Sequence, residues 1–227
     1  MNENKEVISK GNVPVIRAYR DSDKESVRKI CSDTADLGKP VENFFYDREI
    51  FADMVISYYT DFEPGSLWVA QDGQRVVGYL SGCLDTARYI RILLLKIIPK
   101  VLFRAIKSGA LWHKDTVCLV KSAFKSIRLG GLNRKDISTL YPAHLHINLE
   151  DDYRHKGFGK VLVEKFIDQA RLARKSGVHA STSFDNQPAR NFFERMGFSM
   201  IGKYPMSRPG RCEDKGTTYS LVYGRRL

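Results

Sequence analysis

The sequence lacks the features that would assign it to a membrane or secreted class. No segment reaches the roughly 18 to 20 unbroken apolar residues that a membrane-spanning helix requires. The first residues, MNENKEV, lack the basic-then-apolar order of a secretory signal. We therefore expect a cytoplasmic protein without a transmembrane span.

Cysteine is scarce, and its spacing excludes two small-domain classes. The four cysteines lie far apart at positions 31, 83, 118 and 212, and none forms a CxxC pair. This pattern predicts neither a disulfide framework nor a zinc knuckle. We interpret the four as small buried or half-buried side chains.

What the chain does have is length, apolar content and an uneven positive charge. With 227 residues and 43% hydrophobic content, it is predicted to form a single domain, residues 1–227. Residues 86–140 hold twelve basic groups against two acidic ones, which is nearly the whole net charge of +11. The basicity therefore belongs to one segment and needs a local explanation.

Hydrophobic periodicity predicts alternating strands and helices, hence an α/β (α+β) class with a mixed sheet. A strand at 13–19 and helices from about 22 and 46 precede a hairpin whose turn is Asp72-Gly73. Residues 86–128 are amphipathic and predicted to be helical, with an interruption at Pro99 and the loop LGGLNRK after them. Strands at 142–149, 178–184, 198–205 and 217–223 and helices from 157 and 186 complete the chain.

A short stretch, HLHINLEDDYRHKGFGK at 144–160, combines an alternating strand with a glycine-containing turn into a helix. Free amide groups and the positive end of the helix dipole suit a pyrophosphate, and the glycines let the backbone approach it. The loop is neither a GxGxxG dinucleotide loop nor a P-loop, because the third glycine and the GK[ST] ending are missing. By itself it is also compatible with an ordinary strand-to-helix turn.

The motif R-x-x-G-x-G at 154–159 is followed, one helix and one strand later, by N-x-x-A-x-x-F-F-E-R-x-G-F at 186–198. Together they resemble the GNAT superfamily of acyl-CoA-dependent N-acyltransferases. The resemblance covers residues 13–85 and 142–205, and within the superfamily it is similar to the acetyltransferase-like domains fused to O-GlcNAc hydrolases. It implies a mostly antiparallel sheet of about seven strands flanked by helices. The basic helical segment 86–140 would be an insertion between strands 3 and 4.

The resemblance also implies a binding site for acetyl-CoA as cosubstrate. Main-chain groups of Ile147 and Leu149 would pair with the pantetheine arm, in a cleft where two parallel strands splay apart. The remaining residues that it assigns to the cosubstrate are Arg154, His155, Lys156, Gly157, Phe158, Gly159, Lys160, Asn186 and Phe193.

Catalysis requires a base, because an amine with a pKa of about 10.4 is protonated at neutral pH. We place His146 first, Glu150 second and His144 third, and each histidine is equally compatible with a buried, hydrogen-bonded strand residue. A metal pair is disfavoured because spacing places no third ligand. In the family pattern the tyrosine that protonates the leaving thiolate falls at Phe193, which cannot donate a proton. Tyr204, Tyr219 and Tyr223 are alternative acids.

For the acceptor, Tyr46, Tyr58, Tyr59 and Asp61 are candidate contacts to a cationic amine, although such aromatics also pack into cores. The insertion is interpreted first as a lid or a homodimer contact, then as a surface for anionic membranes or acyl chains, and last for nucleic acid. The leading hypothesis is an acetyl-CoA-dependent N-acetyltransferase acting on a primary amine of a small molecule, amino sugar or peptide, with no nucleic acid as partner. The alternatives are a non-catalytic acyl-CoA-binding module and a membrane or nucleic-acid adaptor.

Overall fold

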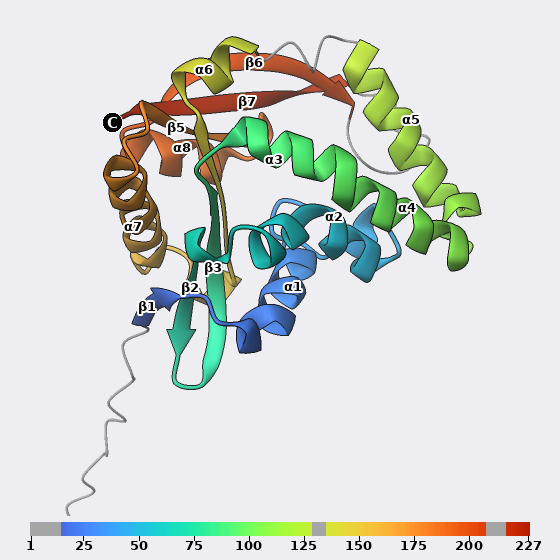
Figure 1. Ribbon diagram of the computed structural model, residues 1–227, viewed down its shortest axis with the longest axis horizontal. Helices are drawn as coiled ribbons and strands as arrows, with labels where there is room; N and C mark the ends of the chain where they lie inside the picture. Colours follow the sequence, from blue (N-terminus) through green and yellow to red (C-terminus); the bar gives the residue numbers. More distant parts are fainter. Residues whose placement is uncertain (1–14, 129–134, 208–216) are drawn as a thin grey trace, which may run out of the picture.

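A computed structural model describes residues 15–128, 135–207 and 217–227 (Figure 1). The predicted loop at 129–134 and the first two residues of the predicted strand at 13–19 lie outside these ranges. The described strands are β1 (Val15–Ala18), β2 (Leu67–Asp72), β3 (Arg75–Cys83), β4 (Ala143–Leu149), β5 (Gly177–Ser183), β6 (Ser199–Ser207) and β7 (Thr217–Arg226). The described α-helices are α1 (Lys24–Asp33), α2 (Arg48–Asp61), α3 (Thr86–Ile92), α4 (Ile98–Lys107), α5 (Lys114–Arg128), α6 (Lys135–Leu140), α7 (Phe158–Leu172) and α8 (Gln187–Arg195).

The strands form one seven-stranded sheet in the order β1-β2-β3-β4-β5-β7-β6. Only the pair β4 and β5 is parallel, and the other neighbours run antiparallel. The predicted hairpin is confirmed, because Asp72 pairs with Arg75 across a turn in which Gly73 has φ +56°. The mixed, mostly antiparallel sheet flanked by helices confirms the predicted fold class.

Two apolar cores lie on opposite faces of the sheet, because successive side chains of a strand point in opposite directions. On β3, Tyr79 joins the core beneath α1 and α2, whereas the next residue, Leu80, joins the core beneath α7. Phe166 and Ile167 of α7 are fully buried in that second core. The sheet is therefore covered on both faces, and the line between β4 and β5 runs through its middle.

The segment between β3 and β4 is mainly helical in the part that the structure describes, as predicted, with a turn at Ser108 and Gly109 after α4. That residues 1–227 form one domain stays a prediction. The expected interruption at Pro99 takes another form, because α3 continues through a π-helical segment, Leu93–Ile97, into α4. Pro99 occupies the first turn of α4, and the wider π turn before it accommodates the missing amide and the proline ring. The helix changes its winding there and does not end.

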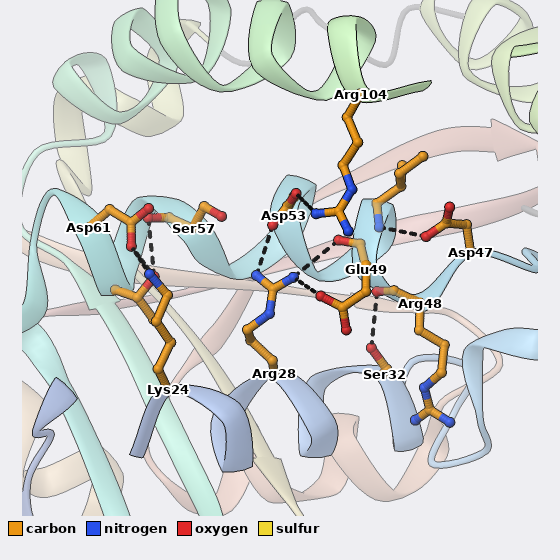
Figure 2. A network of polar contacts seen from close by, with 12 residues as sticks. Lys24, Arg28, Ser32, Asp47, Arg48, Glu49, Asp53, Ser57, Asp61 and Arg104 are labelled. Atoms are coloured by element: carbon orange, nitrogen blue, oxygen red, sulfur yellow. Dashed lines mark hydrogen bonds and ion pairs between the residues drawn. The ribbon is translucent and has the colours of Figure 1, made fainter. Parts of the chain in front are cut away.

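Ion pairs fasten this segment to the rest of the fold. Figure 2 shows Arg28 of α1 between the carboxylates of Asp53 and Glu49 on α2, at 2.8 and 2.5 Å. Arg104 of α4 reaches the other oxygen of Asp53 at 2.7 Å. Arg28 and Asp53 are buried, so each depends on the other to offset the cost of burying its charge. The network fixes which face of α4 is turned toward α2.

Three of the four cysteines lie among the described residues, and Cys212 lies outside them. Cys31 and Cys83 are buried free thiols, as the sequence predicts. Cys118 of α5 is buried and disulfide-bonded, which the sequence analysis did not predict. In the part of the chain that the structure describes, no helix is both long and apolar enough to cross a membrane.

Candidate functional site

The parallel strands β4 and β5 separate soon after they meet. They are in register at Ala143 with Val178 and at His144 with His179, and no further pair joins them among the described residues. Beyond this point β4 remains paired with β3, where the amide of Glu150 donates to the oxygen of Val77 at 3.0 Å. Hydrogen bonds alternate in direction along an antiparallel strand, so the peptide groups of the odd-numbered residues 145–149 face the opening. The result is an unpaired strand edge inside the fold.

This edge forms one wall of a cleft of about 1390 Å³. The other walls come from the loop after α1, the first turns of α7, β5, α8 along its length, and residues of β6 and β7. No described residue of 86–140 lines the cleft. The structure therefore does not support the interpretation of the insertion as a lid in direct contact with the site.

The first turn of α7 offers free amide groups to the cleft. Gly157 is its N-cap, with φ +89° and no side-chain cap, and accepts the first intrahelical bond from the amide of Val161 at 3.3 Å. The amides of Phe158, Gly159 and Lys160 thus have no helical partner. A Cβ added at Gly159 would lie 3.2 Å from the Phe192 ring, so the glycine permits the close approach of α7 and α8. A helix of this length with free amides suits a phosphate group.

Most of the residues predicted to bind the cosubstrate meet in this cleft. The lining includes Ile147, Leu149, Arg154, His155, Gly157, Gly159, Lys160, Asn186 and Phe193. Lys156 and Phe158 do not line it. The ammonium group of Lys156 lies 5.2 Å above the Tyr153 ring, and the Phe158 ring packs 6.2 Å from the same tyrosine. Both point away because the backbone turns sharply at His155, where φ is +61°.

Asn186 and Phe193 each also have a structural role. The side-chain oxygen of Asn186 caps α8 by accepting the amide of Ala189 at 3.2 Å. Phe193 is 5% exposed and stacks on Tyr223 with ring centroids 5.9 Å apart. The predicted alternative acids are not at the site, because no tyrosine is among the described residues that line the cleft.

His144 is a buried and fully hydrogen-bonded residue. The hydroxyl of Thr86 donates to the oxygen of Pro142, so its one proton is used and Nδ1 of His144 must donate to Thr86 at 2.8 Å. Nε2 then accepts the hydroxyl proton of Tyr59 at 2.9 Å. Burial holds the pKa of His144 well below its usual value, with His146 and His179 lowering it further. The structure places His144 in the core and outside the cleft.

His146 occupies the adjoining position on the same side of β4 and opens into the cleft. Its ring centroid lies 6.0 Å from that of His144. The side chain of His146 is exposed to the cleft, yet the protein atoms around its ring desolvate it and lower its pKa to about 4, and His179 adds to the shift. It makes no hydrogen bond to the described part of the chain. A neutral imidazole whose ring nitrogens have no hydrogen bond to the described chain therefore projects into the cleft.

Glu150, the second candidate base, lies outside the cleft. Its carboxylate forms an ion pair with Arg75 at the β2–β3 hairpin. Its amide is used by Val77, so this amide is not free to polarise a carbonyl. The strand ends at Leu149, and the turn that follows directs Glu150 toward the hairpin.

The residues predicted to contact the acceptor are not brought to the cleft. Tyr58 and Tyr59 are 1% exposed, because the insertion covers them and Tyr89 of α3 packs against both rings. The carboxylate of Asp61 pairs with Lys24 at 2.8 Å. Tyr46 is at the surface, where its ring lies 3.7 Å from that of His113. Three of the four lie on α2, whose inner face is sealed by the insertion.

The loop at 34–38 faces β4 across the cleft and was not predicted from the sequence to belong to the site. The amide group of Asn148 donates to Thr34 Oγ1, which ties the loop to β4. Leu37 and Gly38 have φ of +54° and +95°, and a Cβ at Gly38 would lie 2.7 Å from the Arg154 guanidinium. The Leu-Gly pair after α1 was the available signal. In the described ranges, no group of three His, Cys, Asp or Glu side chains is placed to hold a metal ion.

The comparisons with known proteins agree with this geometry. Residues 137–198 match the model of the acetyltransferase (GNAT) family. A crystal structure of SsHAT is 28% identical, with 94% of this chain and 98% of that chain covered and a TM-score of 0.69. The structure of yncA from Salmonella typhimurium, solved with its cofactor acetyl-CoA, is 15% identical, with 95% of each chain covered and a TM-score of 0.57. Drosophila melanogaster polyamine N acetyltransferase is 12% identical, with 95% of this chain and all of that chain covered (100%) and a TM-score of 0.61.

Proposed function

We propose that the chain is an acetyl-CoA-dependent N-acetyltransferase, because residues 137–198 match the GNAT acetyltransferase model and the fold is similar to that of SsHAT. It would act on a primary amine of a small molecule, amino sugar or peptide, by direct attack in a ternary complex. The observation that carries the proposal is the open edge of β4 beside the uncapped first turn of α7, within one cleft. A thioester on a pantetheine arm and a pyrophosphate at its end require these two features side by side.

Acetyl-CoA supplies the acetyl group as an activated thioester, and the chain's own residues hold it. Ile147 offers its peptide groups and Leu149 its amide to the pantetheine arm, because the Leu149 oxygen already accepts from Arg154. The amides of residues 158–160 receive the pyrophosphate. Arg154 donates through Nε to the oxygen of Leu149 at 3.1 Å and pairs with Asp151 at 2.5 Å. Its guanidinium therefore lies between the open edge and the phosphate loop. In this position it would also pair with a phosphate of the cosubstrate, as a second anionic partner beside Asp151.

The acceptor reacts as the neutral amine, after its ammonium form has lost one proton to solvent. His146 is proposed to accept the second proton, which leaves the nitrogen as it bonds to the acetyl carbon, directly or through water. A low pKa keeps its imidazole neutral at neutral pH, which is the form that accepts a proton. The nitrogen becomes far more acidic as it bonds to the acetyl carbon, so a weak base is sufficient at that stage. The departing thiolate takes up a proton from solvent, since its pKa of about 8.5 makes it a tolerable leaving group.

A second candidate function is a non-catalytic acyl-CoA-binding module. Phe193 favours it, because this side chain occupies the position of the family's proton-donating tyrosine and packs into the core. It shares the cosubstrate site with the first candidate but predicts no turnover. The two differ in a single measurable quantity, which is the release of free thiol in the presence of an amine.

The test begins with thermal unfolding in the presence and absence of acetyl-CoA, since a ligand of the native state raises Tm. Thiol release is then followed with a panel of polyamines, amino sugars and peptides carrying a free amino group. Stabilisation with turnover that the His146→Gln variant loses supports the acetyltransferase. Stabilisation without turnover on any amine assigns the module, and the absence of stabilisation overturns both.

A further inference from the structure

The outer surface of the insertion exposes large apolar side chains in a row. Leu95 of the π segment is 71% exposed, Phe103 of α4 is 69% exposed, and Trp112 just beyond α4 is 85% exposed. Leu94, Leu102 and Ile106 are exposed beside them. We call these six residues the outer face. Exposed apolar side chains are ordinary when scattered, but a contiguous group of this kind marks an interaction surface.

The outer face is held outward by the packing on the opposite side of the same helices. Ile97, Val101 and Ala105 are buried at the four-residue spacing of one helix face. Arg104 adds its ion pair to Asp53 of α2 at 2.7 Å. The helix cannot turn its outer face inward without breaking these contacts. The exposed apolar groups are therefore a fixed property of the surface.

Basic groups lie on the same helices as the outer face. Arg91, Lys100 and Lys107 are exposed, and no ion pair within the described part of the chain involves them, although Lys100 lies near enough to Asp61 of α2 to lower the pKa of that carboxyl. Lys114 continues the series at the start of α5. Asp115 is the only acidic residue between positions 86 and 128. Large exposed apolar groups and exposed cations thus occur together on the insertion.

We propose that the outer face binds the surface of a membrane containing anionic lipids. Its apolar side chains would enter the boundary between headgroups and acyl chains, and the lysine and arginine side chains would meet the lipid phosphates. A second copy fits poorly, because a twofold interface would bring the same basic surface against itself. Nucleic acid would satisfy the cations and leave Leu95 and Phe103 without contacts. The proposal concerns a peripheral surface and is independent of the proposed catalytic function.

The test measures cosedimentation of the full chain with vesicles of phosphatidylcholine alone and of phosphatidylcholine with phosphatidylglycerol. We expect binding only to the anionic vesicles, and a loss of about tenfold or more in affinity for the double variant L95E/F103E. The matched control is Leu172→Glu, because Leu172 is 86% exposed on α7, outside the insertion. All these positions are exposed, so Tm should be preserved in each variant.

A second readout locates the contact. Trp112 is one of only two tryptophans, so a blue shift of emission on vesicle binding that Trp112→Phe removes would place the outer face in the bilayer surface. If L95E/F103E binds the vesicles as tightly as the unaltered protein, the apolar side chains do not contribute and the binding comes from net charge alone. This result would overturn the proposal. The absence of binding at low salt would overturn it as well. A dimer in solution that dissociates in the same variant would assign the face to a second copy instead.

Discussion

Nε2 of His144 and the hydroxyl of Tyr59 are hydrogen-bonded at 2.9 Å inside the protein, whereas His146, two residues along the same strand, faces the cleft. Alternation along β4 puts both histidines on one side of the sheet, yet the insertion covers only the first. The two side chains therefore have separable roles, which variants of each can distinguish.

The His146→Gln variant should retain its stability and lose catalysis. His146 lines the cleft without a hydrogen bond to the described chain, so glutamine leaves no buried partner unsatisfied. We expect kcat with an amine acceptor to fall by about 100-fold or more, as for removal of a general base. His113→Gln, at an exposed position beside Tyr46, is the control and should keep full kcat. Steady-state thiol release checks both, and equal kcat in His146→Gln and the unaltered protein would remove His146 from the mechanism.

The His144→Phe variant should instead lose stability. It strips the hydroxyl of Tyr59 of its acceptor and that of Thr86 of a donor, and both lie in the buried layer between β4 and the insertion. The free energy of unfolding should fall by about 1 to 3 kcal/mol. Urea unfolding followed by circular dichroism measures this. An unchanged midpoint would mean that the hydrogen-bonded pair contributes nothing to stability.

Stability should decrease as the pH falls from about 6.5 to about 4. The folded protein lowers the pKa of His146 from 6.5 to about 4, so in this window the unfolded chain binds the additional proton. Stability from this source is complete above pH 6.5 and is lost as the pH falls through the folded pKa. The ion-paired Asp23, Asp33 and Asp61, whose pKa values are lowered from 3.8, act at still lower pH. Thermal unfolding across this window should show a smaller dependence on pH in His146→Gln.

Two glycines with left-handed backbone provide a matched pair for the phosphate loop. Gly157 has φ +89° and Gly109 has φ +74°, and a Cβ at either would meet no atom within 4 Å. Valine at each position should therefore cost a similar strain of about 1 to 2 kcal/mol. Only Gly157→Val should abolish the rise in Tm on addition of acetyl-CoA. Loss of the rise in both variants, or in neither, would count against the first turn of α7 as the pyrophosphate site.

The buried ion pair predicts an asymmetric response in the network of Figure 2. Asp53→Asn leaves the buried Arg28 without a full counter-charge, so the free energy of unfolding should fall by about 3 kcal/mol. Arg104→Gln should cost no more than about 1 kcal/mol, because the Arg104 side chain is 45% exposed. Chemical denaturation compares the two. Equal losses would show that Arg104 matters as much to Asp53 as Arg28 does.

The sequence predicted best what is decided locally. Asp72-Gly73 sets its hairpin through turn chemistry, and the glycines at 157 and 159 mark the turn at which α7 begins. The burial of Tyr58 and Tyr59 was not predictable in this way. It depends on Tyr89, some thirty residues away, packing over α2. The loop at 34–38 likewise became part of the cleft only through a long-range contact, that of Asn148 with Thr34.

The brief meeting of β4 and β5 has a mechanical consequence. Two residue pairs join the half of the sheet containing β1 to β4 to the half containing β5 to β7. On the proposed function, acetyl-CoA would lie along β4 and reach α8, and would thereby bridge the two halves where the backbone does not. Amide hydrogen exchange near the ends of β4 and β5 should then slow when the cosubstrate binds. The departure of CoA would remove this bridge and make the sheet more flexible again. Each catalytic cycle would therefore stiffen the sheet when the cosubstrate binds and loosen it when CoA leaves.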